Sequence, residues 1–227
     1  CSSDLQFSAS LASKQELERL HAMLAPYADQ FRIIIHVDEQ ARVLARHYAD
    51  QIFAGRTHAL DVELGIAAGK HWRRDCLAAW PDPDPSANLM PEVQSPPFWL
   101  DYESLVKSWE DVLGAGSVSL RPFDADLFAS PDVTREICQA FELSGNIGKS
   151  VPRDLPRQPS AAWLTRSRQL NAYFAQCLAS GRVIPRQMWQ RMLAQLEIDG
   201  APIKPSSLHR VSAAFAKIGR ASCREQV

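Results

Sequence analysis

Two apolar runs along the chain predict the strands of a sheet. Residues 31–37 read FRIIIHV, a nearly continuous β-branched run, which is typical of a strand buried on both faces in a parallel sheet. Residues 117–123, SVSLRPF, are a second strand candidate, and residues 7–10 have the pattern of the tail of an earlier one. Because helical patterns lie between these runs, we expect a βαβ arrangement with right-handed crossovers.

The segment before the first long strand has the pattern of an amphipathic helix. Leu17, Leu20 and Leu24 recur at helical spacing. Ser13 stands before them, and Glu16 follows it three residues later, which is a capping-box pattern. We therefore expect a helix that begins directly after Ser13.

The strand over 31–37 leads into a second helical pattern. Asp38 is the expected N-cap, the helix reaches about Phe53, and Gly55 is the expected C-terminal stop. Residues 56–80 have a weaker helical pattern. The remaining helices are expected over 102–113 with Gly114 and Gly116 at the end, after an Asp132 N-cap, and over about 160–179 and 185–197.

A proline-rich stretch follows the weakly helical segment. Residues 80–99 contain six prolines, a density that disfavours helix and sheet interiors. Loops on a rigid sheet commonly set specificity, so Trp80, Phe98 and Trp99 are candidates to stack on a sugar or another flat acceptor. The alternative is an insertion whose aromatic side chains pack at its two ends.

The composition is that of an ordinary globular chain. Its 227 residues are 46% hydrophobic and 22% charged, which excludes disorder, collagen and coiled coil for the chain as a whole. Lys plus Arg number 25 and Asp plus Glu 26, and a net charge of −1 points to neither nucleic acid nor an acidic membrane. No apolar run reaches the roughly 20 residues of a transmembrane helix. Five scattered cysteines make no disulfide framework, so we expect a reducing, cytoplasmic location.

The two ends of the chain have an unusual sequence. Residues 1–5, CSSDL, and residues 218–227, IGRASCREQV, look like translations of the two strands of one sequencing-adapter stem. We expect both to be non-native and exclude them from the domain. The expected organisation is an N-terminally truncated α/β core over 6–150, with a helical part of the same domain over 151–217.

Two features that suggest chemistry have plainer interpretations. Residues 145–150 read GNIGKS, but Leu143 stands where a phosphate-binding loop needs glycine, and the motif follows a helical pattern, so we expect a helix C-cap and loop. The six histidines form no metal-ligand cluster, and we expect no metal. His36 lies near the carboxyl end of the first long strand, where parallel sheets bind ligands. The alternative for His36 is a packed or capping residue.

Two blocks of the chain have a recognisable order of segments. They are residues 33–55, IIIHVDEQARVLARHYADQIFAG, and residues 100–123, LDYESLVKSWEDVLGAGSVSLRPF. With a later helix at 159–171 that contains serine and ends in asparagine, the chain resembles bacterial proteins of the sulfotransferase-like family over about residues 6–175. The resemblance implies an α/β fold, here a partial P-loop-type three-layer sandwich with a parallel sheet and a helical C-terminal portion. It also implies 3′-phosphoadenylyl sulfate (PAPS) as the sulfuryl donor and a hydroxyl acceptor such as a carbohydrate.

The resemblance assigns candidate donor-binding residues to the helix after the first strand. Tyr48 and Gln51 keep the family pattern, but Asp38 stands where the family has an arginine that binds the 3′-phosphate of PAPS, and Arg46 replaces its serine. Arg42 and Arg46 are four residues apart on one helix face. They are the expected replacement for the missing positive charge, and solvated surface arginines are the alternative.

These residues leave three functional hypotheses open. The first is a fragment of a sulfotransferase-like enzyme whose phosphate-cradling loop and general base lie upstream, so no catalytic residue is assigned and PAPS is expected of the full-length protein. The second, favoured by Asp38 and Arg46, is a non-catalytic member of the same fold that serves as a binding or assembly module in surface-polysaccharide production. The third is an unrelated nucleotide-binding α/β protein.

Overall fold

The computed structural model describes residues 11–80, 91–145, 147–152 and 158–216. Over these residues the fold is mixed α/β, with many helices and a small parallel sheet. The chain divides into two compact units whose segments alternate along the sequence. The strand unit comprises residues 1–38 and 102–157, and the helical unit comprises residues 39–101 and 158–227.

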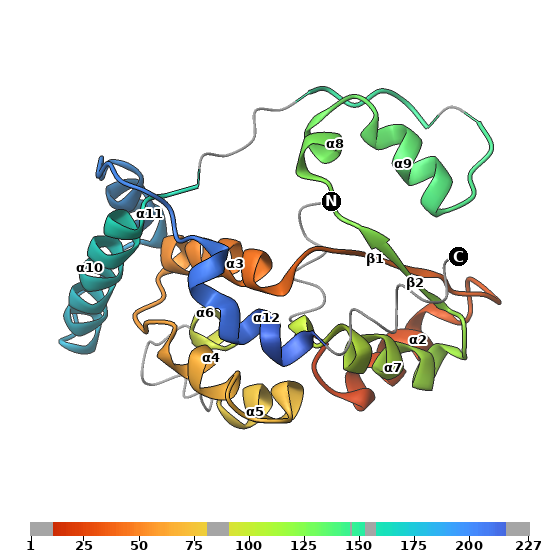
Figure 1. The fold of residues 1–227 in the computed structure, drawn as a ribbon, viewed down its shortest axis with the longest axis horizontal. Helices are drawn as coiled ribbons and strands as arrows, with labels where there is room; N and C mark the ends of the chain where they lie inside the picture. The colour runs from red at the N-terminus through yellow and green to blue at the C-terminus, as the bar shows by residue number, and fades with distance from the viewer. Residues whose placement is uncertain (1–10, 81–90, 146, 153–157, 217–227) are drawn as a thin grey trace. The chain divides into compact units, whose positions relative to one another are not determined.

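The strand unit contains a pair of parallel strands. β1 (Ile33–Val37) pairs with β2 (Val118–Pro122) in a register that joins Ile33 to Val118 and Val37 to Pro122 (Figure 1). Parallel neighbours need a long crossover connection, and the chain between these strands supplies it. The parallel pair predicted from the two apolar runs is therefore confirmed.

The burial of β1 differs from the prediction. Every residue of Ile33–Val37 is half-buried, so the expected strand covered on both faces is wrong for the described part of the chain. Two short strands provide fewer neighbouring side chains than the interior of a wide sheet. An isoleucine-rich run is compatible with either environment.

Short helices adjoin the strand pair within its unit. These are α2 (Lys14–Leu24), α7 (Tyr102–Leu113), α8 (Ala125–Ala129) and α9 (Val133–Ala140) (Figure 1). The predicted capping box begins α2: the Glu16 carboxylate accepts from the Ser13 amide at 2.8 Å, and Ser13 Oγ accepts from the Glu16 amide at 3.3 Å. Asp132 occupies the N-cap position of α9 as predicted, but its side chain makes no capping hydrogen bond there.

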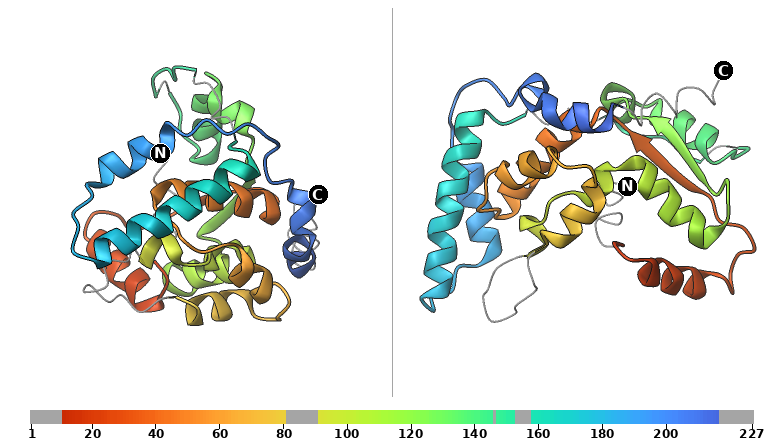
Figure 2. Two further views of the ribbon diagram at one scale, coloured as in Figure 1. Left: turned by 90° about the vertical axis from the view of Figure 1, so that its left-hand side faces the viewer. Right: turned by 60° about the horizontal axis from the view of Figure 1, so that its bottom comes forward.

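The helical unit is built around one central helix, α3 (Gln40–Ala54). Its other elements are α4 (Asp61–Ile66), α5 (Trp72–Ala78), α6 (Pro91–Gln94), η2 (Phe98–Leu100), α10 (Ala161–Ala179), α11 (Arg186–Ala194), η3 (Pro205–Leu208) and α12 (His209–Phe215). Elements from both segments of the unit contact α3, among them α6, α10, α11 and α12 (Figure 2). The central helix therefore holds the two segments together.

The two ends of α3 compare differently with the prediction. Gly55 is its C-cap as expected, in the left-handed conformation with φ 114°. The N-cap is Glu39 and not Asp38: the Glu39 carboxylate accepts from the amides of Ala41 at 3.1 Å and Arg42 at 2.9 Å. Because glutamate reaches the first-turn amides with its longer side chain, the helix begins one residue later than predicted.

The proline-rich stretch contributes to the core of the helical unit. Residues 81–90 lie outside the described residues, but Phe98 and Trp99 are 1% and 3% exposed. The Trp80 ring packs edge-on against Phe98 with 5.6 Å between centroids. The prediction that Phe98 and Trp99 stack on an acceptor is therefore wrong, because both rings are covered by protein.

Several predictions fall outside what the structure describes. The strand tail at 7–10 and the adapter-like ends at 1–5 and 218–227 are among them. Of the GNIGKS motif, residues 145 and 147–150 are described, and they form no helix after the glycines. No helix within the described ranges is long and apolar enough to cross a membrane.

Candidate functional site

The four predicted donor-binding residues all lie on α3 but face different surroundings. Arg42 is exposed and Arg46 is half-buried. Tyr48 and Gln51, on the opposite side of the helix, are buried at 5% and 4% exposure. The structure therefore brings the two arginines together on one face and places the other two residues in the interior.

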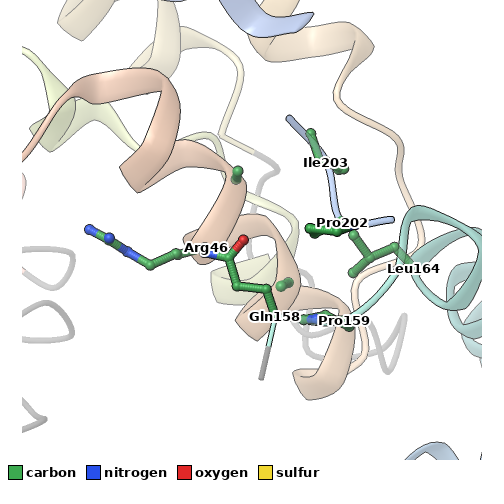
Figure 3. Close-up of a pocket in the computed structure, with 8 residues that line it drawn as sticks. Arg46, Gln158, Pro159, Leu164, Pro202 and Ile203 are labelled. Atoms are coloured by element: carbon green, nitrogen blue, oxygen red, sulfur yellow. The ribbon is translucent and has the colours of Figure 1, made fainter. Parts of the chain in front are cut away.

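A small, shallow hollow adjoins Arg46. Its wall is largely apolar, with Ala45, Ala49, Leu164, Pro159, Pro202 and Ile203 beside Gln158 (Figure 3). The Arg46 side chain leads away from Pro202 and Ile203, so that its charged end lies outside the hollow (Figure 3). The interior of the hollow therefore has few polar groups that could bind an anion.

The interior side of α3 faces a buried guanidinium that the sequence did not single out. Arg56 donates five hydrogen bonds, as many as its N–H groups can make. They reach the carbonyls of His58 (3.0 Å) and Ala59 (2.7 Å), Gln51 Oε1 (2.6 Å), and the Glu63 oxygens Oε1 (2.7 Å) and Oε2 (2.9 Å). Arg56 and Glu63 are 1% and 0% exposed, so they form a completely buried ion pair.

This ion pair accounts for the positions of Tyr48 and Gln51. The Arg56 guanidinium carbon lies 4.9 Å from the centre of the Tyr48 ring, within the range of a cation–π contact. Gln51 accepts from Arg56 and donates from Nε2 to the carbonyl of Ser95 at 2.9 Å. Burial raises the pKa of Tyr48 despite the nearby positive charge, so its phenol stays neutral. Both side chains have structural partners, and their donor-binding role stays a prediction.

Asn171 ties the two segments of the helical unit together beside Arg56. Its Nδ2 donates to the carbonyls of Ile52 and Arg56, each at 2.8 Å, and its Oδ1 accepts from Trp189 Nε1 at 2.6 Å. Asn171 is 0% exposed, and these bonds satisfy it within the protein. The asparagine that fits the family pattern at the end of 159–171 has a structural role.

The N-terminus of α3 is already occupied by a negative charge. The Glu39 carboxylate accepts from two first-turn amides and also from the Ser212 hydroxyl on α12. A helix N-terminus attracts anions because its amides point outward and its dipole is positive there. A phosphate on this turn would have to displace the Glu39 carboxylate.

A second polar cluster lies at the carboxyl ends of the paired strands. His36 of β1 and Arg121 of β2 are register partners, and both contact Glu136 of α9. Arg121 donates from Nε and Nη2 to the two Glu136 oxygens at 2.5 and 2.9 Å, and His36 Nε2 lies 3.0 Å from Glu136 Oε1. The hydrogen bonds from Arg121 hold the pKa of Glu136 at about 2.

The chemistry of this cluster follows from the charge on Glu136. An ionised carboxylate only accepts, so His36 Nε2 carries the proton in this contact. The His36 ring also packs edge-on against Phe128 of α8, with 4.8 Å between centroids. The sequence pattern predicts His36 at a strand end, and the structure adds the carboxylate of Glu136 and the guanidinium of Arg121 beside it. Glu136 gave no sequence signal, because it is 100 residues from His36.

Comparison of the chain with protein-family models, curated proteins and solved structures gave no match. In the described part of the chain, no group of three or more His, Cys, Asp and Glu side chains is arranged to hold a metal ion. The thiol of Cys76 is buried, which raises its pKa and leaves it protonated.

Proposed function

We propose that this chain is part of a sulfotransferase-like protein that binds PAPS and serves transfer of its sulfuryl group to a hydroxyl acceptor such as a carbohydrate. In this reaction the acceptor oxygen attacks sulfur, the bond from sulfur to the bridging phosphate oxygen breaks, and 3′-phosphoadenosine 5′-phosphate (PAP) leaves. A base takes the proton of the hydroxyl. Positive groups and amides that hold the phosphates stabilise the charge on the leaving group.

The observation that carries the proposal is the order of elements around the parallel strand pair. β1 leads into the long helix α3, and α7 leads into β2, which returns beside β1 in parallel register. This is the order in which the resemblance places its donor-side strand and helix and its second strand. It supports a partial P-loop-type three-layer sandwich with a helical C-terminal portion.

Arg42 and Arg46 are the residues proposed to hold the 3′-phosphate of the donor. They lie one turn apart in the first half of α3, where guanidinium groups suit bidentate pairing with phosphate. Tyr48 and Gln51 support the site indirectly, because they fix the opposite side of α3 against Arg56. A metal ion is not part of the proposal.

Thermal unfolding with PAP and with 5′-AMP tests the donor site. A ligand present at about 100 times its Kd stabilises a protein by about 2.7 kcal/mol, which raises the Tm of a chain of this size by roughly 5–10 °C. We expect that rise with PAP and a smaller one with 5′-AMP, which lacks the 3′-phosphate. Arg42→Ala with Arg46→Ala should abolish the difference between the nucleotides, whereas Arg19→Ala, an exposed arginine on α2, should keep it. Equal shifts with both nucleotides would contradict the proposal.

The carboxylate at the start of α3 favours a second candidate, a non-catalytic member of the same fold that acts as a binding or assembly module in surface-polysaccharide production. Glu39 occupies the helix N-terminus, and Asp38 stands where the family has its phosphate-binding arginine. Replacing Asp38 with Arg and Glu39 with Ser, which still caps a helix, removes both negative charges. PAP binding by this variant, with none by the native chain, would favour the second candidate. Failure of both proteins to bind PAP would contradict the sulfotransferase-like assignment itself.

A further inference from the structure

The near-neutral charge of the whole chain conceals a strongly basic segment. Residues 158–196 contain five arginines and neither Asp nor Glu. The segment forms α10 and α11, which lie side by side and are joined by residues 180–185 (Figure 2). Its positive charge is therefore concentrated on one helical hairpin.

The turn and the second helix of this hairpin expose both arginines and apolar side chains. Three arginines and three apolar residues make up this surface, which we call the arginine tip: Arg182, Val183, Arg186, Met188, Arg191 and Met192. Val183 is 88% exposed, Met188 47% and Met192 40%. Met188 and Met192 are one helical turn apart, so they share a face of α11, with Arg191 beside them.

The arginine tip is presented by a well-packed support. Phe174 on α10 and Trp189 on α11 stack edge to face with 5.1 Å between centroids, and Leu193 completes the core between the helices. Trp189 is also hydrogen-bonded to the buried Asn171. Trp189 and Leu193 form the inward-facing apolar side of α11. Val183, Met188 and Met192 are not part of this core and are exposed.

The charges of the arginine tip are not compensated within the described part of the chain. Arg182, Arg186 and Arg191 are exposed and form no ion pair with any described residue. Three uncompensated guanidinium groups on the same turn and helix as exposed valine and methionine side chains suit a partner that is both anionic and apolar. An anionic lipid bilayer combines these properties at its surface.

We propose that the arginine tip docks on anionic lipid bilayers. The arginines pair with lipid phosphates while keeping their alkyl parts against the apolar zone. Val183, Met188 and Met192 enter the boundary between headgroups and acyl chains. A soluble polyanion would pair with the arginines but would leave these three side chains in water, so the apolar residues favour the bilayer.

Cosedimentation with vesicles tests the proposal on the native chain. We expect binding to vesicles of phosphatidylcholine with about one-third phosphatidylglycerol, little binding to phosphatidylcholine alone, and a loss of binding as salt is raised. Equal binding to both vesicle types, or none to the anionic ones, would overturn the proposal.

Two variants separate the bilayer from a soluble polyanion. The first variant replaces all three arginines of the tip: Arg182→Gln, Arg186→Gln and Arg191→Gln. It should lower the partition coefficient of the chain into anionic vesicles roughly a hundredfold, since each arginine near an anionic surface contributes about fivefold. Val183→Ser with Met192→Ser should also weaken vesicle binding but leave retention on immobilised heparin unchanged. Arg166→Gln, an exposed arginine on α10, serves as the matched control. Vesicle binding that is insensitive to the apolar substitutions would identify a purely electrostatic polyanion site and contradict the proposal.

Discussion

Arg56 shows how a single buried charge organises the helical unit. Its five hydrogen bonds join the end of α3, the loop that follows and Glu63 of α4. Burying two charges costs free energy that their attraction only partly offsets, so the pair contributes little net stability compared with apolar residues of similar volume. Removing one partner has a different effect, because the other charge remains buried and uncompensated.

Glu63→Gln should therefore destabilise the chain strongly. The change leaves the Arg56 guanidinium buried without its counter-charge, and we expect a loss of about 3–5 kcal/mol in the free energy of unfolding. Arg74→Gln is the matched control: it removes an exposed ion pair with Asp75, with Arg74 70% exposed, and should cost less than about 1 kcal/mol. Urea titrations monitored by circular dichroism measure both. Similar losses for the two variants would contradict the buried-pair interpretation.

Glu136 predicts a pH dependence for the strand unit. Its pKa of about 2 lies below the ordinary carboxyl value, because Arg121 donates to both of its oxygens. A carboxyl whose pKa is lowered on folding stabilises the folded state above its ordinary pKa. That contribution is lost as pH falls from about 4.5 toward about 2.

Glu136→Gln should weaken this dependence. The amide does not ionise, so the variant should have a lower free energy of unfolding than the native chain at about pH 6. This difference in free energy should shrink as pH falls to about 2. Denaturant titrations of both proteins across this range measure it. A difference that is constant with pH would show that the Glu136 charge has no part in the stability of the fold.

The elements show which local signals predict structure and which do not. The sequence predicts features that depend on residues close together along the chain. Among them are the capping box of α2, the end of α3 at Gly55 and the extents of α7 and α10. Side-chain preference predicts Asp38 as the cap of α3, but the Glu39 carboxylate accepts from the first-turn amides instead. The burial of β1 was overestimated, because an apolar run does not reveal how many strands will lie beside it.

Two glycines in helical contexts should respond oppositely to alanine. Gly55 has φ 114°, in the left-handed region that costs an L-residue about 1–2 kcal/mol, so Gly55→Ala should destabilise the chain by about that amount. Gly65 lies inside α4 with open space around its Cβ position, and Gly65→Ala should stabilise by about 0.5–1 kcal/mol. Thermal melts of the two variants check the signs. A gain in stability from Gly55→Ala would contradict its role as the C-cap.

At the scale of the whole molecule, composition concealed two features. The net charge of −1 argued against anionic partners, yet the arginines of 158–196 share one hairpin without an acidic residue. The Arg56–Glu63 and Arg121–Glu136 ion pairs also add nothing to the net charge, although each joins separate elements of its unit. The parallel α/β arrangement was readable from the alternation of apolar runs and helical patterns, whereas the interleaving of two compact units was not.

We propose that α3 holds the 3′-phosphate of a sulfuryl donor through Arg42 and Arg46. The most direct measurement is an NMR titration of the native chain with PAP and, in parallel, with 5′-AMP, following the backbone amides. We expect saturable chemical-shift changes over Gln40–Arg46 with PAP and much weaker ones with 5′-AMP. No shift in α3 at millimolar PAP, or equal shifts with both nucleotides, would contradict it.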